Sequence, residues 1–189
     1  MVEAMLVLLQ ERGYAGTGVN AVLEAGAAPK GSLYFHFPEG KESLGVRAVE
    51  LAAEQYRAVI AAAAAAGDAA EAVGHVLDQV AEELVAADFA AGCPVAVVTL
   101  ETSAHSDRLR AACEAAYDSW IALVREHLVA HGVAPGEATA LAETVVSTVE
   151  GAMIVSRARR DVGPVRSARQ VLVDLLRTRL ADVDGGTGR

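Results

Sequence analysis

The chain has few aromatic residues, few cysteines and no strand-like pattern, and each shortage excludes a class of protein. Aromatic residues make up 4% of its 189 residues. Segments in which Val, Ile, Thr or aromatic residues alternate with polar ones are absent, so a β-sheet protein is not expected. Two cysteines, Cys93 and Cys113, cannot build a disulfide framework and suit a reducing compartment.

Long hydrophobic runs and positive charge are also scarce. The longest uncharged apolar run, residues 58–66, is shorter than the roughly 20 residues that cross a membrane. No secretion signal opens the chain, so we expect a cytoplasmic protein that does not bind a membrane. The net charge is −9, with 16 basic and 25 acidic residues, and a nucleic-acid site must therefore be local.

Alanine is abundant, and it is the strongest helix former. Apolar periodicity, helix caps and breakers predict an all-α chain of nine helices. The expected helices are residues 1–12, 17–23, 29–35, 41–66, 68–87, 94–102, 107–131, 135–160 and 164–181. The three short helices predict a compact N-terminal domain over residues 1–45, followed by a larger helical domain over 46–182. Residues 183–189 are predicted to be a disordered tail.

Two short helices joined by a tight turn, within residues 17–36, predict a helix-turn-helix. The second helix begins Pro29-Lys-Gly-Ser32, which places short polar side chains and free backbone amides at its N-terminus. That end of a recognition helix enters the major groove of DNA. Two short helices that pack for purely structural reasons give the same pattern, so the pattern alone leaves both interpretations open.

Longer stretches of this region are similar to the DNA-binding domain of the TetR family of repressors. The similar stretches are Glu11-Arg-Gly-Tyr-Ala-Gly-Thr17, Lys30-Gly-Ser-Leu-Tyr-Phe-His-Phe-Pro38 and Gly40-Lys-Glu-Ser-Leu44. The second half resembles the LmrA/YxaF subgroup of that family. There the similar residues are Gly92-Cys-Pro-Val-Ala-Val-Val-Thr-Leu-Glu101, Leu109-Arg-Ala-Ala-Cys113, Trp120 and Glu150-Gly-Ala152.

The resemblance implies a DNA-binding repressor, not an enzyme, that binds a palindromic operator in double-stranded DNA as a homodimer. The DNA contacts it implies are Thr17, Lys30, Gly31, Ser32, Tyr34, Phe35, His36 and Lys41. Thr17 would cap the second helix and meet a phosphate. The bases would be faced by Lys30, Gly31 and Ser32. The DNA backbone would be touched by Tyr34, Phe35 and His36. Lys41 would pair with a phosphate. A core position for Tyr34 and a structural role for His36 are the alternatives.

Two departures from the family pattern affect the DNA-binding half. Ala27 stands at a turn position that is usually glycine, so we expect a left-handed backbone there at about 1 kcal/mol. Residues 1–50 hold four basic and six acidic residues. A helical small-molecule-binding protein with weak or lost DNA binding is therefore the alternative function.

The family also implies release from the operator by a small lipophilic or planar effector, with no cofactor. The candidate effector-binding residues are Tyr56, His75, Phe89, Tyr117, Trp120 and Met153, and a place in the core is the alternative for each. The candidate dimerisation residues are Val145, Val149, Ala152, Leu172, Leu175 and Leu176. The alternative is that this apolar stripe is buried within one chain.

Enzyme and metal sites have little support in the sequence. His105-Ser106-Asp107 contains the residue types of a catalytic triad, but neighbours in sequence do not form one, and Ser106 is better explained as a helix cap. His127 and His131 are spaced as two metal ligands on one helix face, without a third. Oxidant sensing by Cys93 is a further alternative, because thiols near helix N-termini can have a lowered pKa.

Overall fold

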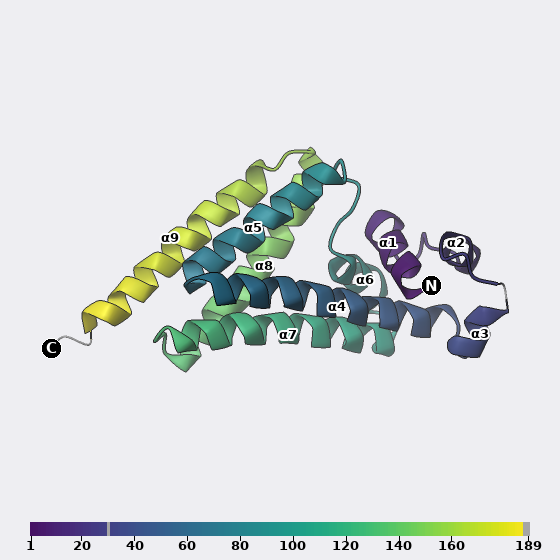
Figure 1. Cartoon of the computed structure of the whole chain (residues 1–189), viewed down its shortest axis with the longest axis horizontal. Helices are drawn as coiled ribbons and strands as arrows, with labels where there is room; N and C mark the ends of the chain where they lie inside the picture. Colours follow the sequence, from purple (N-terminus) through teal and green to yellow (C-terminus); the bar gives the residue numbers. More distant parts are fainter. Residues whose placement is uncertain (30, 187–189) are drawn as a thin grey trace. The chain divides into compact units, whose positions relative to one another are not determined.

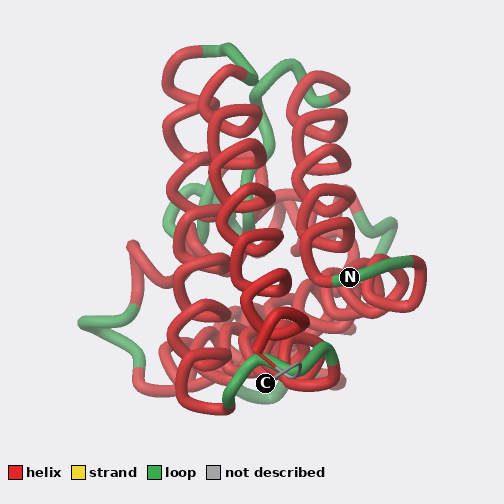
Figure 2. The backbone as a smooth tube through the Cα atoms, turned by 90° about the vertical axis from the view of Figure 1, so that its left-hand side faces the viewer, coloured by secondary structure: helices red, strands yellow, loops and turns green. Residues whose placement is uncertain are grey.

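The computed structural model describes residues 1–29 and 31–186, and within this part every regular element is a helix (Figures 1 and 2). The nine described helices confirm the all-α prediction. They are α1 (Val2–Arg12), α2 (Val19–Ala25), α3 (Ser32–His36), α4 (Lys41–Ala66), α5 (Ala69–Ala86), α6 (Pro94–Thr102), α7 (Asp107–Ala130), α8 (Pro135–Arg159) and α9 (Gly163–Gly186).

Local chemistry explains where three of the helices begin. Asp68 and Glu71 form a reciprocal capping box before α5: the Glu71 amide donates to Asp68 at 2.9 Å and the Asp68 amide to Glu71 at 3.2 Å. Pro94 and Pro135 occupy the first turns of α6 and α8. At the other end of the chain, residues 183–186 are helical where a disordered tail is expected, because neither proline nor a left-handed glycine ends α9 sooner. Residues 187–189 lie outside the described part.

The chain divides into two compact units, which we describe separately. The first unit comprises residues 1–55 and 90–117, and the second comprises residues 56–89 and 118–189. The expected domain boundary at residue 45 therefore does not coincide with the edge of a compact unit. The reason is that α6 and the beginning of α7 pack with the N-terminal helices.

The core of the first unit is built from apolar side chains of six helices, α1, α2, α3, α4, α6 and α7. Leu33 of the short helix α3 is fully buried, which ties this helix to the others. Burial of one such side chain stabilises a fold by roughly 1.5–3 kcal/mol. The other fully buried large side chains of this unit are Met5, Leu9, Val22, Leu44, Val49, Val95, Val98 and Leu109.

In the second unit, α5 lies along α9, and α8 contacts both (Figure 1). The contact faces carry the buried residues Leu77, Leu84, Ala138, Ala142, Leu172 and Leu176. Within the described part of the chain, α8 alone is long and apolar enough to cross a membrane by length and composition. The sequence argument from uncharged runs overlooked it because three glutamates and two arginines interrupt its apolar residues. Part of this helix packs on the chain itself, but only 22% of its most apolar stretch is buried there.

Candidate nucleic-acid interface and effector groove

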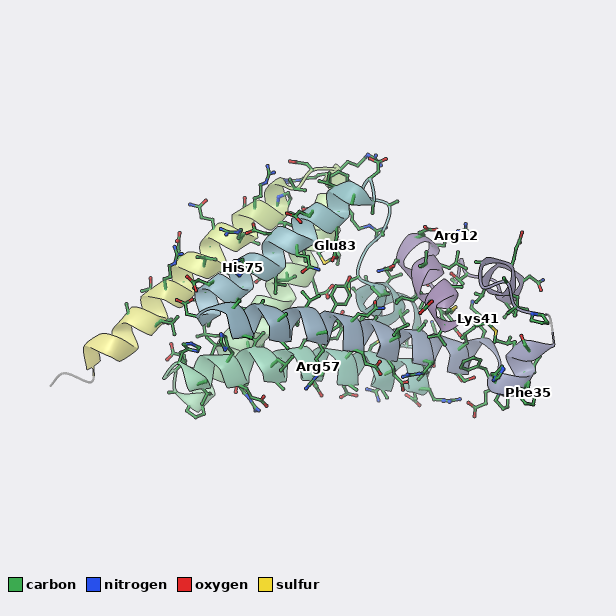
Figure 3. All side chains as sticks on the ribbon, in the orientation of Figure 1. Arg12, Phe35, Lys41, Arg57, His75 and Glu83 are labelled. Carbon is green, nitrogen blue, oxygen red and sulfur yellow. The ribbon has the colours of Figure 1, made fainter. Side chains whose placement is uncertain are left out.

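Helix α3 exposes the side chains that the sequence assigns to DNA. Tyr34 is 65% exposed and Phe35 81% exposed, and His36 is exposed as well. The rings of Phe35 and His36 meet edge to face, with centroids 4.9 Å apart (Phe35 is labelled in Figure 3). Adjacent exposed aromatic residues are unusual on a protein surface and indicate a partner. The exposure of Tyr34 also contradicts the core-aromatic alternative.

The N-terminal turn of α3 is open to solvent on one side. A Cβ atom built at Gly31 would meet nothing within 4 Å, so packing within the chain does not require glycine there. The Ser32 hydroxyl donates to the Pro29 carbonyl at 2.7 Å and closes the turn. Lys30, the third residue assigned to the bases, lies outside the described residues.

Ala27 has the predicted left-handed conformation, with φ 47°. It lies between α2 and α3, where its amide donates to the Glu24 carbonyl at 3.1 Å. The next amide, that of Ala28, donates to the Leu23 carbonyl at 2.9 Å. These bonds satisfy the end of α2 while the chain reverses toward α3, which explains why the strained conformation is kept.

Thr17 does not have the capping role that the family resemblance implies. Its side chain is completely buried, and its hydroxyl donates to the Gly13 carbonyl at 2.6 Å. Gly18, not Thr17, precedes the first residue of α2, and no side chain caps that helix. A buried carbonyl in an irregular turn needs a donor, and Thr17 supplies it. The predicted capping role of Thr17 is therefore wrong, while its phosphate contact stays a prediction.

Lys41 is also engaged inside the first unit. Its ammonium group donates to the Tyr14 carbonyl at 2.6 Å and lies 4.2 Å from the centroid of the Tyr14 ring. Burial lowers the pKa of Lys41, and the Glu101 carboxylate opposes that shift. Burial, together with the nearby charge of Glu42, raises the pKa of the Tyr14 phenol. The contact of Lys41 with a phosphate stays a prediction, since in this structure its ammonium group bonds to the turn that contains Tyr14.

Residues at the corner between α6 and α7 contact the head of α4. The Ser106 hydroxyl donates to Glu42 at 2.6 Å, and Arg108 pairs with both Glu39 and Glu42, the latter at 3.7 Å. Ser106 also accepts the Leu109 amide at 3.1 Å, which confirms its predicted role as a helix cap. Sequence reasoning missed the ion pairs of Arg108, because no local pattern relates positions so far apart.

The second unit contains a groove of about 450 Å³ between the end of α4 and α5. Its lining residues are mostly small and apolar: Ala58, Val59, Ala62, Ala63, His75, Val76 and Gln79. Of the six candidate effector-binding residues, His75 alone lines this groove (Figure 3). The groove thus offers an apolar wall with an imidazole and an amide as polar groups.

The other candidate effector residues have different surroundings. Trp120 and Met153 are 4% and 7% exposed, and the Trp120 ring meets that of Tyr56 edge to face at 5.5 Å. Phe89 is half-buried in a left-handed conformation, and its carbonyl accepts a bond from Arg157 at 3.4 Å. Tyr117 belongs to the first unit. For Trp120 and Met153 the structure favours the core alternative.

The predicted dimerisation stripe is largely buried inside the single chain. Val145, Ala152, Leu172 and Leu176 are at most 8% exposed, while Val149 and Leu175 are half-buried. Four of the six residues therefore have the alternative role in the subunit core, because α8 and α9 pack against α5. On these two helices, the large apolar residues that are exposed among those whose burial is described are Ile154, Val155 and Val171.

The two cysteine thiols and the imidazoles of His127 and His131 have contacts within the chain. Cys93 and Cys113 are both buried, the Cys113 thiol donates to the Val95 carbonyl at 3.7 Å, and burial raises the pKa of Cys113. His127 lies 3.2 Å from the Gly67 carbonyl, and His131 lies 2.9 Å from the His127 carbonyl. In the part of the chain that the structure describes, no three acidic, histidine or cysteine side chains form a group suited to a metal ion.

A helix-turn-helix unit with an exposed recognition helix, followed by an α-helical unit, defines a DNA-binding transcriptional regulator. Two family models match the chain: "Bacterial regulatory proteins, tetR family" over residues 2–48, and "Transcriptional regulator LmrA/YxaF-like, C-terminal domain" over residues 69–171. The chain belongs to the TetR family of transcriptional regulators, which bind DNA, form dimers and are not enzymes.

Individual relatives agree with this assignment over nearly the whole chain. The HTH-type transcriptional regulator LmrA of Bacillus subtilis is 34% identical over 171 residues, which are 90% of this chain and 91% of the relative. An uncharacterised HTH-type transcriptional regulator of Mycobacterium tuberculosis is 35% identical over 187 residues, 96% of this chain and 95% of the relative. A TetR transcriptional regulator from Legionella pneumophila shares the fold, with a TM-score of 0.82, 18% identity and coverage of 92% and 94%.

Proposed function

We propose that this protein is a cytoplasmic, homodimeric repressor that binds a palindromic operator and is released by a small apolar effector. The observation that carries the proposal is the exposed aromatic surface of α3, held on a rigid base. Tyr34, Phe35 and His36 project from a helix that Leu33 anchors completely in the core. Side chains fixed in this way reach DNA without losing much conformational freedom on binding.

The contacts of α3 with DNA follow from its two ends. At the N-terminal end, Gly31 leaves room for close approach of a base edge or a phosphate, and the helix dipole favours the phosphate. At the other end, the Tyr34 hydroxyl and the His36 imidazole can bond to phosphate oxygens, while Phe35 packs on sugar. Since the chain carries a net charge of −9, affinity must come from these local contacts more than from general attraction.

A second copy of the chain would cover the exposed face of α8. Ile154 and Val155 are 50% and 41% exposed there, and Val171 of α9 is 65% exposed. A Cβ atom at Gly151 would meet nothing within 4 Å, so a partner helix can approach this position closely. Two such helix pairs would form a four-helix bundle across the symmetry axis. This face replaces the buried stripe as the proposed dimer contact.

The dimer contact is tested by placing a charge on it. We expect Ile154→Arg to convert the dimer to a monomer in light scattering at micromolar concentration, because an unpaired charge would be buried. Val85→Arg is the matched control, since Val85 is 58% exposed on a different helix, α5. A dimer that survives Ile154→Arg refutes this contact.

The effector site proposed here is the groove between α4 and α5. Its alanine and valine wall suits a lipophilic or planar compound, and His75 and Gln79 provide two hydrogen-bonding groups. Filling of Ala62 by a larger side chain tests the site directly. We expect Ala62→Phe to block release by any effector that frees wild-type protein from DNA, while leaving DNA binding intact.

DNA binding is tested by fluorescence anisotropy with duplexes from upstream of the protein's own gene, against a scrambled competitor. We expect tight, competitor-resistant and salt-sensitive binding, which Phe35→Ala and Tyr34→Ala weaken. Val7→Ala is the control, because Val7 is an exposed apolar residue of α1 in the same unit. Binding that depends equally on Val7 would contradict the assignment of α3. A wild-type protein that prefers no duplex would instead favour a small-molecule-binding protein that has lost DNA binding.

A further inference from the structure

The segment from Gly92 to Glu101 has no place in DNA contact or in the effector groove, yet both of its ends contact the N-terminal helices. The Gly92 amide donates to the Gln10 carbonyl of α1 at 3.3 Å. Glu101, near the end of α6, accepts the Ala15 amide at 2.8 Å across 86 residues of sequence. Between these ends, Val95 and Val98 are fully buried in the first unit. The segment that contains α6 is thus attached at two points, to α1 and to the turn that follows α1.

The Glu101 carboxylate fits the turn after α1 so closely that only glycine is compatible with it. Gly13 has a left-handed φ of 73°, and a Cβ atom there would lie 2.1 Å from Oε1 of Glu101. The carboxylate therefore occupies the space that the missing side chain leaves. This is a shape match between two segments far apart in sequence, in addition to a charge-assisted hydrogen bond.

The same turn is held by two further side chains. Thr17 bonds to the Gly13 carbonyl at 2.6 Å, and Lys41 bonds to the Tyr14 carbonyl at 2.6 Å. Glu101 also attracts the Lys41 ammonium group electrostatically. Helix α2 begins at Val19, immediately after this turn, and α3 follows α2. The conformation of residues 13–17 therefore sets where the helix-turn-helix starts.

We propose that Glu101 is a positioning residue for DNA binding. Its carboxylate fixes the turn of residues 13–17 and the Lys41 side chain, and through them the placement of α2 and α3, without touching DNA itself. The inference rests on the proposed DNA-binding function. By this inference, α6 is a supporting helix of the DNA-binding unit.

The experiment compares three variants on a duplex that the wild-type protein selects from a random-sequence pool, with a scrambled duplex beside it. We expect Glu101→Ala to weaken binding to the selected duplex about tenfold, the loss expected from one charge-assisted hydrogen bond. Glu101→Gln keeps an acceptor oxygen and should bind within about threefold of wild type. Glu114→Ala is the matched control: it removes one exposed carboxylate of the same unit, which pairs with Arg110 at 2.9 Å.

Two readouts separate positioning from a general loss of folding. Binding to the scrambled duplex depends on charge and should not fall in Glu101→Ala, and recovery by Glu101→Gln should be nearly complete. A double-mutant cycle with Gly13→Ala adds an independent check, because the added Cβ collides with Glu101 in one background and not in the other. We expect Gly13→Ala to weaken specific binding more in the presence of Glu101 than in its absence.

The outcomes are distinct. If Glu101→Ala binds the selected duplex as wild type does, or if the two changes are additive, the positioning role is refuted. Equal losses on both duplexes with a lowered unfolding temperature also refute it, since they show a purely structural contact. If the wild-type protein selects no duplex, the proposed function fails, and the inference fails with it.

Discussion

Replacement of Thr17 by valine tests whether this residue holds a turn or contacts DNA. Valine has nearly the same shape, so the change creates no cavity, but it removes the hydroxyl that donates to the Gly13 carbonyl at 2.6 Å. Thr17 is completely buried, so water cannot replace the lost donor without rearrangement. An unsatisfied buried acceptor costs about 1–3 kcal/mol. That loss is a large part of the 5–15 kcal/mol by which folded proteins are typically stable.

The assay is urea-induced unfolding of Thr17→Val and wild type at one fixed protein concentration, because dimer formation contributes to apparent stability. Thr178→Val is the matched control. Thr178 makes the same type of bond, to the Asp174 carbonyl at 2.9 Å, but on the exposed surface of α9. We expect the control to change the free energy of unfolding by less than about 0.5 kcal/mol. Unchanged stability of Thr17→Val together with weakened DNA binding would refute the structural role and favour the phosphate contact.

Three further predictions concern stability. Ala27→Gly should raise the free energy of unfolding by up to about 1 kcal/mol, because relief of left-handed strain exceeds the added chain entropy of the unfolded state; a decrease in the urea midpoint would contradict it. Asp68→Ala should lower the free energy of unfolding by about 1 kcal/mol, because the capping box is lost. Thermal unfolding measures this change, and an unchanged midpoint would show that the capping box does not stabilise the protein. Cys113 should react slowly with alkylating reagents in the native state. Because burial raises its pKa, its contribution to stability is complete at neutral pH and is lost as pH rises through the ordinary range of a thiol; rapid alkylation at neutral pH without unfolding would refute its burial.

Two bonds between distant segments, Glu101 to Ala15 and Ser106 to Glu42, cannot be predicted from the sequence. The residues Gly92 to Glu101 resemble the LmrA/YxaF subgroup, but nothing in their spacing relates Glu101 to Ala15. Similarly, the immediate neighbours of Ser106 predict its role as a cap, while its second bond, to Glu42, depends on the fold. A hydrogen bond between residues far apart in sequence depends on how the helices pack, and a short stretch of sequence does not determine that packing.

The dimer face illustrates a different limit. Apolar residues at helical spacing predicted a buried face on α8 and α9, and the structure confirms that Val145, Ala152, Leu172 and Leu176 are buried. The helical spacing of apolar residues predicts that one face of a helix is buried, but it does not show whether the same chain or a second copy buries that face. The exposed residues Ile154 and Val155 became candidates only once the intramolecular contacts were known.

The sequence by itself determined the features that arise between near neighbours. The all-α fold, the capping box at Asp68, the proline-started helices and the left-handed Ala27 all depend on residues within about one turn of each other. The tertiary structure alone decided the roles of Thr17, Lys41 and Glu101. Each of these polar groups is bonded to a backbone group of the turn after α1. Glu101 of α6 and Lys41 of α4 reach that turn only because distant segments pack together, and Thr17 is completely buried, so its hydroxyl bonds within the chain, to the Gly13 carbonyl.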